Sequence, residues 1–254
     1  MSLEGPAAGA VPAIRAVRIP AHSRVREGFP NLPTPFRAPA TCDTSVAAAL
    51  LPTHRIPPFT PGQRIGLFGG TFDPPHEAHL GACLLAMKRL RLDRVWWLVT
   101  PGNPLKDTLG LAPLDARIAA ARMLARHPRI VVTGLEAGIG VRFTYDTIHR
   151  LVVCCRGAQF VWIMGADNLR GFHRWQNWRR IAALVPIAVV DRRGPSLYSI
   201  ASVAAQALAR YRIPERAAAR LPGCRPPAWV FLHGLKSPLS STALRLERRS
   251  QKGH

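Results

Sequence analysis

The sequence has few acidic residues and no long apolar run. Among its 254 residues, 14 are Asp or Glu and 35 are Lys or Arg, which gives a formal net charge of +21. A basic surface attracts phosphate groups whatever the fold, so the charge alone would admit a protein that binds nucleic acid or anionic membranes. However, no apolar run approaches the roughly 20 residues of a membrane span, and no block of consecutive like charges is present. We therefore expect neither a membrane nor a nucleic acid as a partner.

Cysteines are also few. The five cysteines are odd in number and form no CxxC pair, so neither a disulfide framework nor a zinc knuckle is indicated. Within residues 1–22 every apolar run is interrupted by proline or a charge, which is not typical of a secretory signal. The same residues are arginine-rich and acid-poor, so an organellar transit peptide stays open. We expect a reducing, cytoplasmic location.

The composition changes near residue 60. Residues 1–60 are rich in proline, alanine and arginine and show no lasting period of 2 or 3.6. We predict a disordered extension there, or a start codon assigned too early, and a folded domain over residues 61–250. The hydrophobic content of 48% for the whole chain is sufficient for a buried core.

Short β-rich runs alternate with helical patterns from residue 64 on, which is typical of a parallel α/β sheet. The expected strands are residues 64–69, RVWWLVT, RIVVTG, QFVWIMG, PIAVV and AWVFLH. The expected helices are residues 77–91, 113–126, 145–154, 175–184 and SSTALRLERR. The apolar residues expected on the buried side of the first helix are Leu80, Leu84, Leu85 and Met87.

The stretch GLFGGTFDPPHEAHL, residues 66–80, lies where the first strand turns into a helix. Ligands of open parallel sheets bind outside the carboxyl ends of the strands, near the free N–H groups of helix N-termini. Gly69 and Gly70 permit close approach of a phosphate, while His76 and His79 share one face of the first helical turn and can donate hydrogen bonds to an anion. Taken singly, such glycines and histidines are more often structural. The histidine spacing does not match HExxH, and a GxGxxG fingerprint is absent.

The same stretch resembles the GGTFDPxHxGH signature of the nucleotidylyltransferase superfamily, and in particular of bacterial nicotinate-nucleotide adenylyltransferases. Four further segments resemble motifs of that family, in the same order: PGNPLKD, RFTYDTI, MGADNL and LSSTALR. The resemblance extends over residues 64–247. Two residues depart from the family pattern, Ala78 where glycine is usual and Leu105 where histidine is usual.

The resemblance implies a Rossmann-like α/β fold with an open parallel sheet flanked by helices. It also implies transfer of the adenylyl group of ATP to nicotinate mononucleotide, with Mg²⁺ on the leaving pyrophosphate. The attacking 5′-phosphate is already an anion at neutral pH. Catalysis of such a reaction is therefore mainly positioning and stabilisation of charge.

The resemblance also implies roles for individual residues. The implied catalytic residues are His76, His79, Lys106 and Arg245, with His79 at the α-phosphate. The implied ATP-binding residues are Gly69, Gly70, Thr71, Phe72, His76, His79, Asp167, Ser240, Ser241, Thr242 and Arg245. The implied residues for nicotinate mononucleotide are Thr144 and Trp175, and no protein ligand to a metal is expected.

Several of these residues also admit a structural role. Asp167 follows a buried strand, where a carboxylate is costly unless it forms a bond, and a helix N-cap is an equally open role for it. Trp178 is expected in the core. Donors around Thr144, with Arg142 nearby and no acid facing the pyridine substituent, predict a preference for the acid mononucleotide over its amide.

Two other functions stay open at this point. Phosphopantetheine adenylyltransferase shares the first motif and the last one, although FTYDT and GADN fit the pyridine-nucleotide branch better. A basic RNA-binding protein is the alternative from another class, but the sequence has no RRM, KH or zinc-finger signature.

Overall fold

The computed structural model of the chain describes residues 52–102, 110–191 and 197–234. A parallel sheet runs through them, in the strand order β3-β2-β1-β4-β5-β6. Its strands are β1 (Arg64–Gly70), β2 (Arg94–Val99), β3 (Ile130–Thr133), β4 (Gln159–Gly165), β5 (Ile187–Val190) and β6 (Trp229–Leu232). Parallel strands that are covered on both faces are apolar almost throughout, as RVWWLV and QFVWIMG are. The predicted fold class and all six predicted strands are confirmed.

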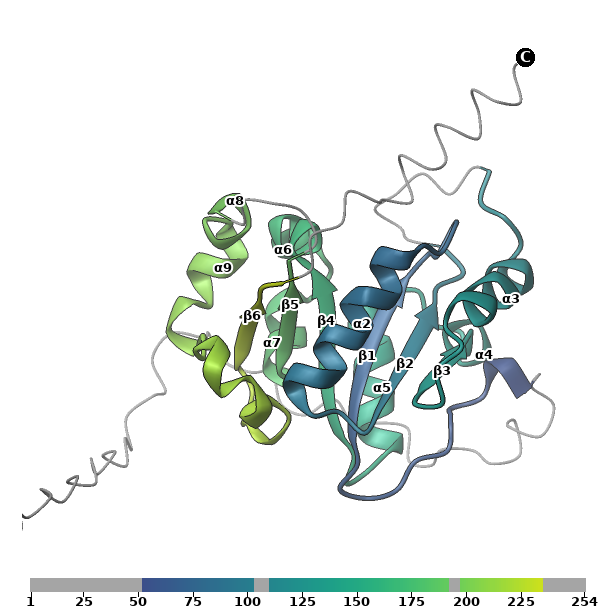
Figure 1. Ribbon diagram of the computed structural model, residues 1–254, viewed down its shortest axis with the longest axis horizontal. Helices are drawn as coiled ribbons and strands as arrows, with labels where there is room; N and C mark the ends of the chain where they lie inside the picture. The colour runs from purple at the N-terminus through teal and green to yellow at the C-terminus, as the bar shows by residue number, and fades with distance from the viewer. Residues whose placement is uncertain (1–51, 103–109, 192–196, 235–254) are drawn as a thin grey trace, which may run out of the picture. The chain divides into compact units, whose positions relative to one another are not determined.

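Helices cover both faces of the sheet. The α-helices are α2 (Glu77–Leu90), α3 (Leu114–Leu124), α4 (Leu135–Gly138), α5 (Thr144–Cys154), α6 (Ala166–Gly171), α7 (Trp178–Leu184), α8 (Leu197–Ile200) and α9 (Val203–Ala207). The 3-10 turns are η1 (Pro52–His54), η2 (Phe172–Arg174), η3 (Ala209–Tyr211) and η4 (Glu215–Gly223). In Figure 1, α2 lies in front of the sheet, while α5 and α7 lie behind it.

The predicted helices that fall on described residues are confirmed, with one shifted start. The helix expected from residue 175 begins at Trp178, because η2 and the left-handed backbone of Asn177 (φ 56°) precede it. The predicted helix SSTALRLERR lies outside the described residues.

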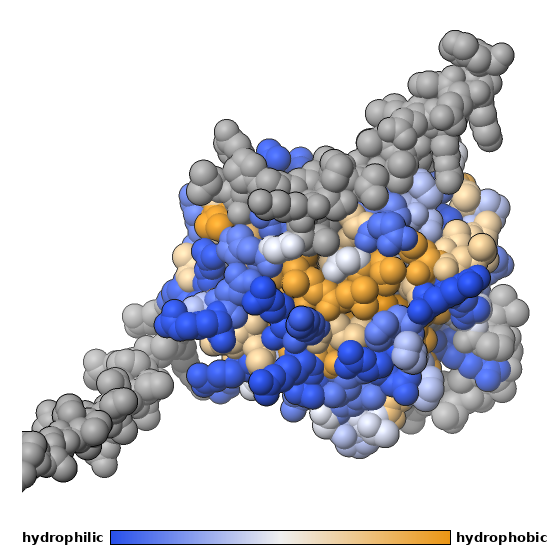
Figure 2. Space-filling view, viewed as in Figure 1, coloured by the Kyte–Doolittle hydropathy of each residue, from blue (hydrophilic) through white to orange (hydrophobic). Residues whose placement is uncertain are grey.

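Helix α2 packs on the sheet through small side chains together with Met87 and Leu90, whereas Leu84 points away. Ala82 and Ala86 are fully buried, and Met87 is 2% exposed, whereas Leu84 is 37% exposed. Leu84 is two residues from both alanines, about 200° around the helix, so it lies on the opposite side. The prediction that Leu84 faces the core is therefore wrong. Figure 2 shows apolar surface over the outward side of α2.

Turn η1 is tied to the end of β3. The Thr133 hydroxyl donates to the Thr53 carbonyl (2.9 Å), and the Gly134 N–H donates to the same carbonyl (2.8 Å). A Cβ on Gly138 would lie 2.4 Å from the His54 carbonyl oxygen, so only glycine permits this approach. These contacts hold residues 53 and 54, which fall in the predicted extension, against the sheet.

Two further findings concern cysteines and membrane helices. Cys83, Cys155 and Cys224 are free thiols, while Cys154 is disulfide-bonded, a bond that the odd count and the spacing do not predict. In the described residues, no helix has the length and apolar character needed to cross a bilayer.

The order of the strands fixes where a ligand can bind. The chain passes from β1 to β2 and β3 on one side, and then crosses to β4 on the other side of β1. The strand order therefore reverses between β1 and β4. Open α/β sheets bind ligands in the crevice that such a reversal opens at the carboxyl ends of the strands.

Candidate active site

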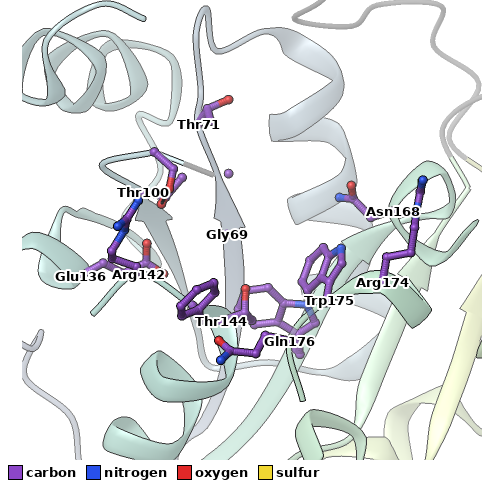
Figure 3. Close-up of a pocket in the computed structure, with 14 residues that line it drawn as sticks. Gly69, Thr71, Thr100, Glu136, Arg142, Thr144, Asn168, Arg174, Trp175 and Gln176 are labelled. Atoms are coloured by element: carbon purple, nitrogen blue, oxygen red, sulfur yellow. Dashed lines mark hydrogen bonds between the residues drawn. The ribbon is translucent and has the colours of Figure 1, made fainter. Parts of the chain in front are cut away.

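A cavity of about 230 Å³ lies at this reversal point. Figure 3 shows Trp175 and Asn168 on one side of it and Thr100 and Glu136 on the other, with Gly69 of β1 between them. The residues that line it are Gly69, Gly70, Thr71, Thr100, Gly102, Glu136, Arg142, Phe143, Thr144, Trp162, Asn168, Arg174, Trp175 and Gln176. They come from β1 and β4 themselves and from the segments that follow β1, β2, β3 and β4. Five of the predicted site residues, Gly69, Gly70, Thr71, Thr144 and Trp175, therefore meet in one place.

Gly69 sets how closely the end of β1 approaches the cavity floor. A Cβ built on Gly69 would lie 2.6 Å from the Trp162 ring, which is closer than real contacts allow. Glycine at this position lets the Trp162 indole pack directly on the strand. Trp162 is a cavity residue that the sequence analysis does not identify, because it is one of several tryptophans in buried strands.

The histidine pair lies at the start of α2, as predicted. His76 is the N-cap residue of the helix, and its backbone N–H donates to Nδ1 of His79 (3.3 Å). An acceptor nitrogen carries no proton, so the neutral His79 ring holds its proton on Nε2. The two rings stack with centroids 3.8 Å apart. The helix end thus orients His79 as an Nε2–H donor, although neither His76 nor His79 is among the residues that line the cavity.

Phe72 does not face the cavity. Its side chain is 1% exposed and stacks on Trp97, with ring centroids 4.8 Å apart and planes 6° apart. Its ring also lies 5.0 Å from the His79 ring. The left-handed backbone of Phe72 (φ 47°) accompanies this inward orientation, which motif position alone does not reveal. Phe72 supports the His79 ring from the core side, and it is not among the residues that line the cavity.

Arg117 of α3 connects the loops that follow β1 and β2. Its side chain is buried, and its guanidinium donates to the carbonyls of Ala112 (2.7 Å), Thr71 (2.8 Å), Thr100 (2.7 Å) and Pro101 (3.1 Å). Thr71 and Thr100 both line the cavity. Arg117 is therefore a positioning residue, which the sequence analysis misses because an arginine in a helical pattern normally lies on a solvated face.

Burial lowers the pKa of Arg117, and the nearby Asp73 carboxylate opposes that shift. Asp73 is itself buried, and its Oδ2 accepts the N–H of Ala112 (3.4 Å). An arginine side chain stays protonated in proteins. The cation therefore binds the loop carbonyls at all ordinary pH values.

Glu136 is a second residue that the sequence analysis misses. It is 6% exposed, lines the cavity, and accepts a hydrogen bond from the Thr147 hydroxyl on Oε1 (3.0 Å). Burial raises the pKa of the Glu136 carboxyl, and the hydroxyls of Thr100 and Thr147 oppose the rise. The expectation that no acid faces this part of the site is therefore wrong.

The aromatic wall of the cavity is Trp175. It meets Trp162 edge-on at 6.3 Å between ring centroids, and Phe172 edge-on at 5.4 Å. These contacts hold the Trp175 ring from two sides. Trp178 is 7% exposed and packs on Phe172, which confirms its predicted place in the core.

Asp167 lies in the first turn of α6, beside the cavity residue Asn168. It is exposed rather than buried, and the N-cap of α6 is Gly165. Both arguments made from the sequence, a costly buried carboxylate and a helix cap, are wrong. Its carboxylate instead lies near the positive end of the α6 dipole.

Five predicted site residues fall on parts of the chain that the structure does not describe: Lys106, Ser240, Ser241, Thr242 and Arg245. Within the described ranges, no group of three or more His, Cys, Asp or Glu side chains is arranged to hold a metal ion.

Comparison with known proteins gives concordant matches. The family described as cytidylyltransferase-like matches residues 67–247. A Bradyrhizobium protein named "Probable nicotinate-nucleotide adenylyltransferase" is 60% identical over 182 residues, which are 72% of this chain and 95% of that protein. A Methylorubrum extorquens protein of the same name is 58% identical over 72% of this chain and 98% of its own length.

A solved structure supports the fold. The Plasmodium falciparum nicotinic acid mononucleotide adenylyltransferase complexed with NaAD superposes with a TM-score of 0.54 at 16% identity, over 72% of this chain and 83% of that one. With these sequence matches, the chain belongs to the nicotinate-nucleotide adenylyltransferase family, within the cytidylyltransferase-like proteins.

Proposed function

We propose that this protein transfers the adenylyl group of ATP to nicotinate mononucleotide, giving deamido-NAD and pyrophosphate in NAD biosynthesis. The observation that carries the proposal is the cavity at the strand reversal. It joins the glycine-rich end of β1 to an aromatic wall and a helix start, so it offers a phosphate site next to a ring site. The family of the chain and the names of its relatives support the same activity.

ATP binds at the end of β1 and the start of α2 in this account. Gly69 and Gly70 let the phosphates approach the backbone, and the helix N-terminus attracts their negative charge. His79 donates from Nε2 to the α-phosphate, where charge builds up as the mononucleotide phosphate attacks. A fixed donor at such a position stabilises the transition state more than the ground state.

The mononucleotide binds on the other side of β1. Trp175 stacks on the pyridine ring, and the first N–H groups of α5 around Thr144 meet the carboxylate. The first N–H groups of a helix have no partner within the helix, so they are available for an anion. In this proposal the 5′-phosphate lies between the two sites, in line with the α-phosphorus of ATP.

The remaining charge is balanced by groups proposed from the sequence alone. Lys106 and Arg245 neutralise phosphates, and Ser240, Ser241 and Thr242 add donors at the triphosphate. Mg²⁺ would arrive with ATP as part of the substrate and would offset negative charge on the leaving pyrophosphate, because it binds substrate phosphates in preference to all-protein sites. Asp167 serves the adenosine side. We infer a cytoplasmic enzyme without nucleic-acid or membrane partners.

A pyrophosphate-release assay with ATP and a panel of acceptors tests the proposal. We expect turnover with nicotinate mononucleotide and little with phosphopantetheine. Turnover with phosphopantetheine alone would assign the chain to the other adenylyltransferase. Steeply salt-dependent binding to RNA, without turnover of ATP, would favour the RNA-binding alternative.

Variants of Trp175 test the ring site. Trp175→Ala should raise the KM for the mononucleotide about tenfold or more, since loss of a stacking partner costs ~1–3 kcal/mol. Trp175→Phe keeps an aromatic face and is the matched control. Equal KM values in wild type and Trp175→Ala would remove Trp175 from the site.

A further inference from the structure

Glu136 is an acid inside the cavity without a cationic partner among the described residues. It is 6% exposed, and the ion pairs found in the described part of the chain do not include it. The side-chain contacts of its carboxyl are the hydroxyls of Thr147 and Thr100. A buried carboxylate normally requires a cation or several donors, so this environment suits the neutral form of the acid.

The hydrogen-bond inventory also admits a neutral acid, although hydroxyls that donate to the carboxyl favour its ionised form. Each threonine hydroxyl has one proton to donate, and each also reaches a backbone carbonyl: Thr147 reaches that of Phe143 (3.3 Å), and Thr100 that of Gly102 (3.1 Å). An ionised Glu136 can only accept, so it competes with those carbonyls for the two protons. A protonated Glu136 adds a third proton, so both hydroxyls can donate to their backbone carbonyls while the carboxyl itself donates to one hydroxyl oxygen.

Few charges face Glu136 from the neighbouring elements. His54 of η1, which packs against α4, lies 3.8 Å from Asp115, and Arg142 lines the same cavity. Arg142 is exposed, so solvent screens its charge. Among the described residues of α5 and of the segment after β2, the groups that face the carboxyl are the neutral hydroxyls already named. Burial accordingly raises the pKa of Glu136 above its ordinary value.

We propose that Glu136 is a specificity-determining residue that keeps a proton, so that the cavity presents a neutral hydrogen-bonding acid to the substituent of the pyridine ring. This inference rests on the proposed function. A neutral Glu136 lets the cavity accept the carboxylate of nicotinate mononucleotide beside the N–H groups at Thr144. An ionised Glu136 would put a second negative charge in the same cavity and repel that substrate.

The proposal predicts that substrate choice depends on pH. As pH rises, Glu136 loses its proton and binding of the acid mononucleotide weakens. The amide mononucleotide carries a neutral substituent, so it escapes this repulsion. Groups that act on the phosphates, His79 included, affect both substrates alike and cancel in the ratio of their kcat/KM values.

The experiment measures kcat/KM for both mononucleotides across the whole pH range in which the enzyme stays folded, in the wild type and in Glu136→Gln. We expect the acid-to-amide ratio to fall about tenfold or more in the wild type. A repulsion between substrate and Glu136 that is equivalent to one pKa unit changes the ratio by a factor of ten. In Glu136→Gln, which mimics the protonated acid, the ratio should stay constant. In Glu136→Ala the ratio should also stay constant with pH, because the titrating group is removed.

If the acid-to-amide ratio changes with pH in the same way in the wild type and in Glu136→Gln, the proposal is overturned, since a purely structural glutamate does not change substrate choice with pH. If Glu136→Gln does not fold, the wild-type ratio decides alone, and a constant ratio overturns the proposal. Absence of pyrophosphate release with every mononucleotide would overturn the proposed function and this inference together, whereas parallel profiles in active enzymes overturn only the inference.

Discussion

At the scale of single residues, the chemistry depends on how the backbone orients side chains. The His76 N–H donates to Nδ1 of His79 and thereby fixes which nitrogen of His79 can donate to a phosphate. A motif shows that two histidines are present, but it does not show which ring nitrogen is available. That detail follows only from the extended N-cap conformation of His76 (φ −148°, ψ 164°).

His79 variants separate the donor role from the helix cap. His79→Ala should lower kcat by about a hundredfold or more, because loss of one preorganised donor costs ~3 kcal/mol in the transition state. His79→Asn retains an oxygen that can accept from the His76 N–H but has no donor at the position of Nε2. We expect it to lose a similar amount of activity while its melting temperature stays closer to that of the wild type. Near wild-type turnover in a folded His79→Ala protein would exclude the catalytic role.

The raised pKa of Glu136 also predicts how the stability of the protein varies with pH. Its pKa is raised in the folded protein above the ordinary value of 4.5, so the folded state binds its proton more tightly than the unfolded state does. The stability that this proton contributes is complete below the unfolded pKa and is lost as pH rises through the folded pKa. Relative to Glu136→Gln, the wild type should therefore lose melting temperature with rising pH. A constant difference between the two melting temperatures across this range would contradict a retained proton.

At the scale of elements, sequence patterns predict the sheet better than the contacts around the site. Runs such as RVWWLV have one interpretation, because a short β-rich run between helical patterns fits a buried parallel strand. Arg117 and Leu84 show where such reasoning fails. Both lie on helices, and which side of a helix is buried depends on the elements that pack against it, here two loops for Arg117 and the alanine face of α2 for Leu84.

Replacing Arg117 tests its role in holding the loops together. Arg117→Met keeps much of the volume but removes the four donors, and buried carbonyls without a partner cost about 1–3 kcal/mol each where water cannot reach them. We expect about 3 kcal/mol less stability in urea unfolding, and a kcat/KM reduced about tenfold or more because the loops carry Thr71 and Thr100.

Arg122→Met on the same helix is the matched control, since Arg122 is exposed and donates one bond, to the Val132 carbonyl (3.3 Å). Its effect on stability should be within about 0.5 kcal/mol. If the two variants behave alike, the loop contacts of Arg117 contribute no more than an exposed arginine does.

At the scale of the whole molecule, the region that aligns with the relatives is 72% of the chain. The 182 residues that align with the Bradyrhizobium relative make up 95% of that protein, so activity should not need the N-terminal segment of this chain. The boundary matters, however, because Thr53 and His54 contact the end of β3 and α4.

Two deletions test this boundary. Removal of residues 2–51 should leave activity close to that of the full chain. Removal of residues 2–58 also takes away the carbonyl that accepts from Thr133 and Gly134, so the melting temperature should fall while activity at low temperature is retained. A soluble, folded but inactive protein lacking residues 2–51 would show that the N-terminal segment is part of the active unit.

The most direct test of the account compares kcat/KM for nicotinate mononucleotide and its amide at neutral pH, with ATP as the donor. The N–H groups at Thr144 can donate hydrogen bonds to a carboxylate. The NH₂ of a carboxamide would face them donor to donor, which would cost about 1–3 kcal/mol of binding free energy. We therefore predict a preference for the acid of roughly ten- to a hundredfold. Equal values, or a preference for the amide, would contradict the account of the site.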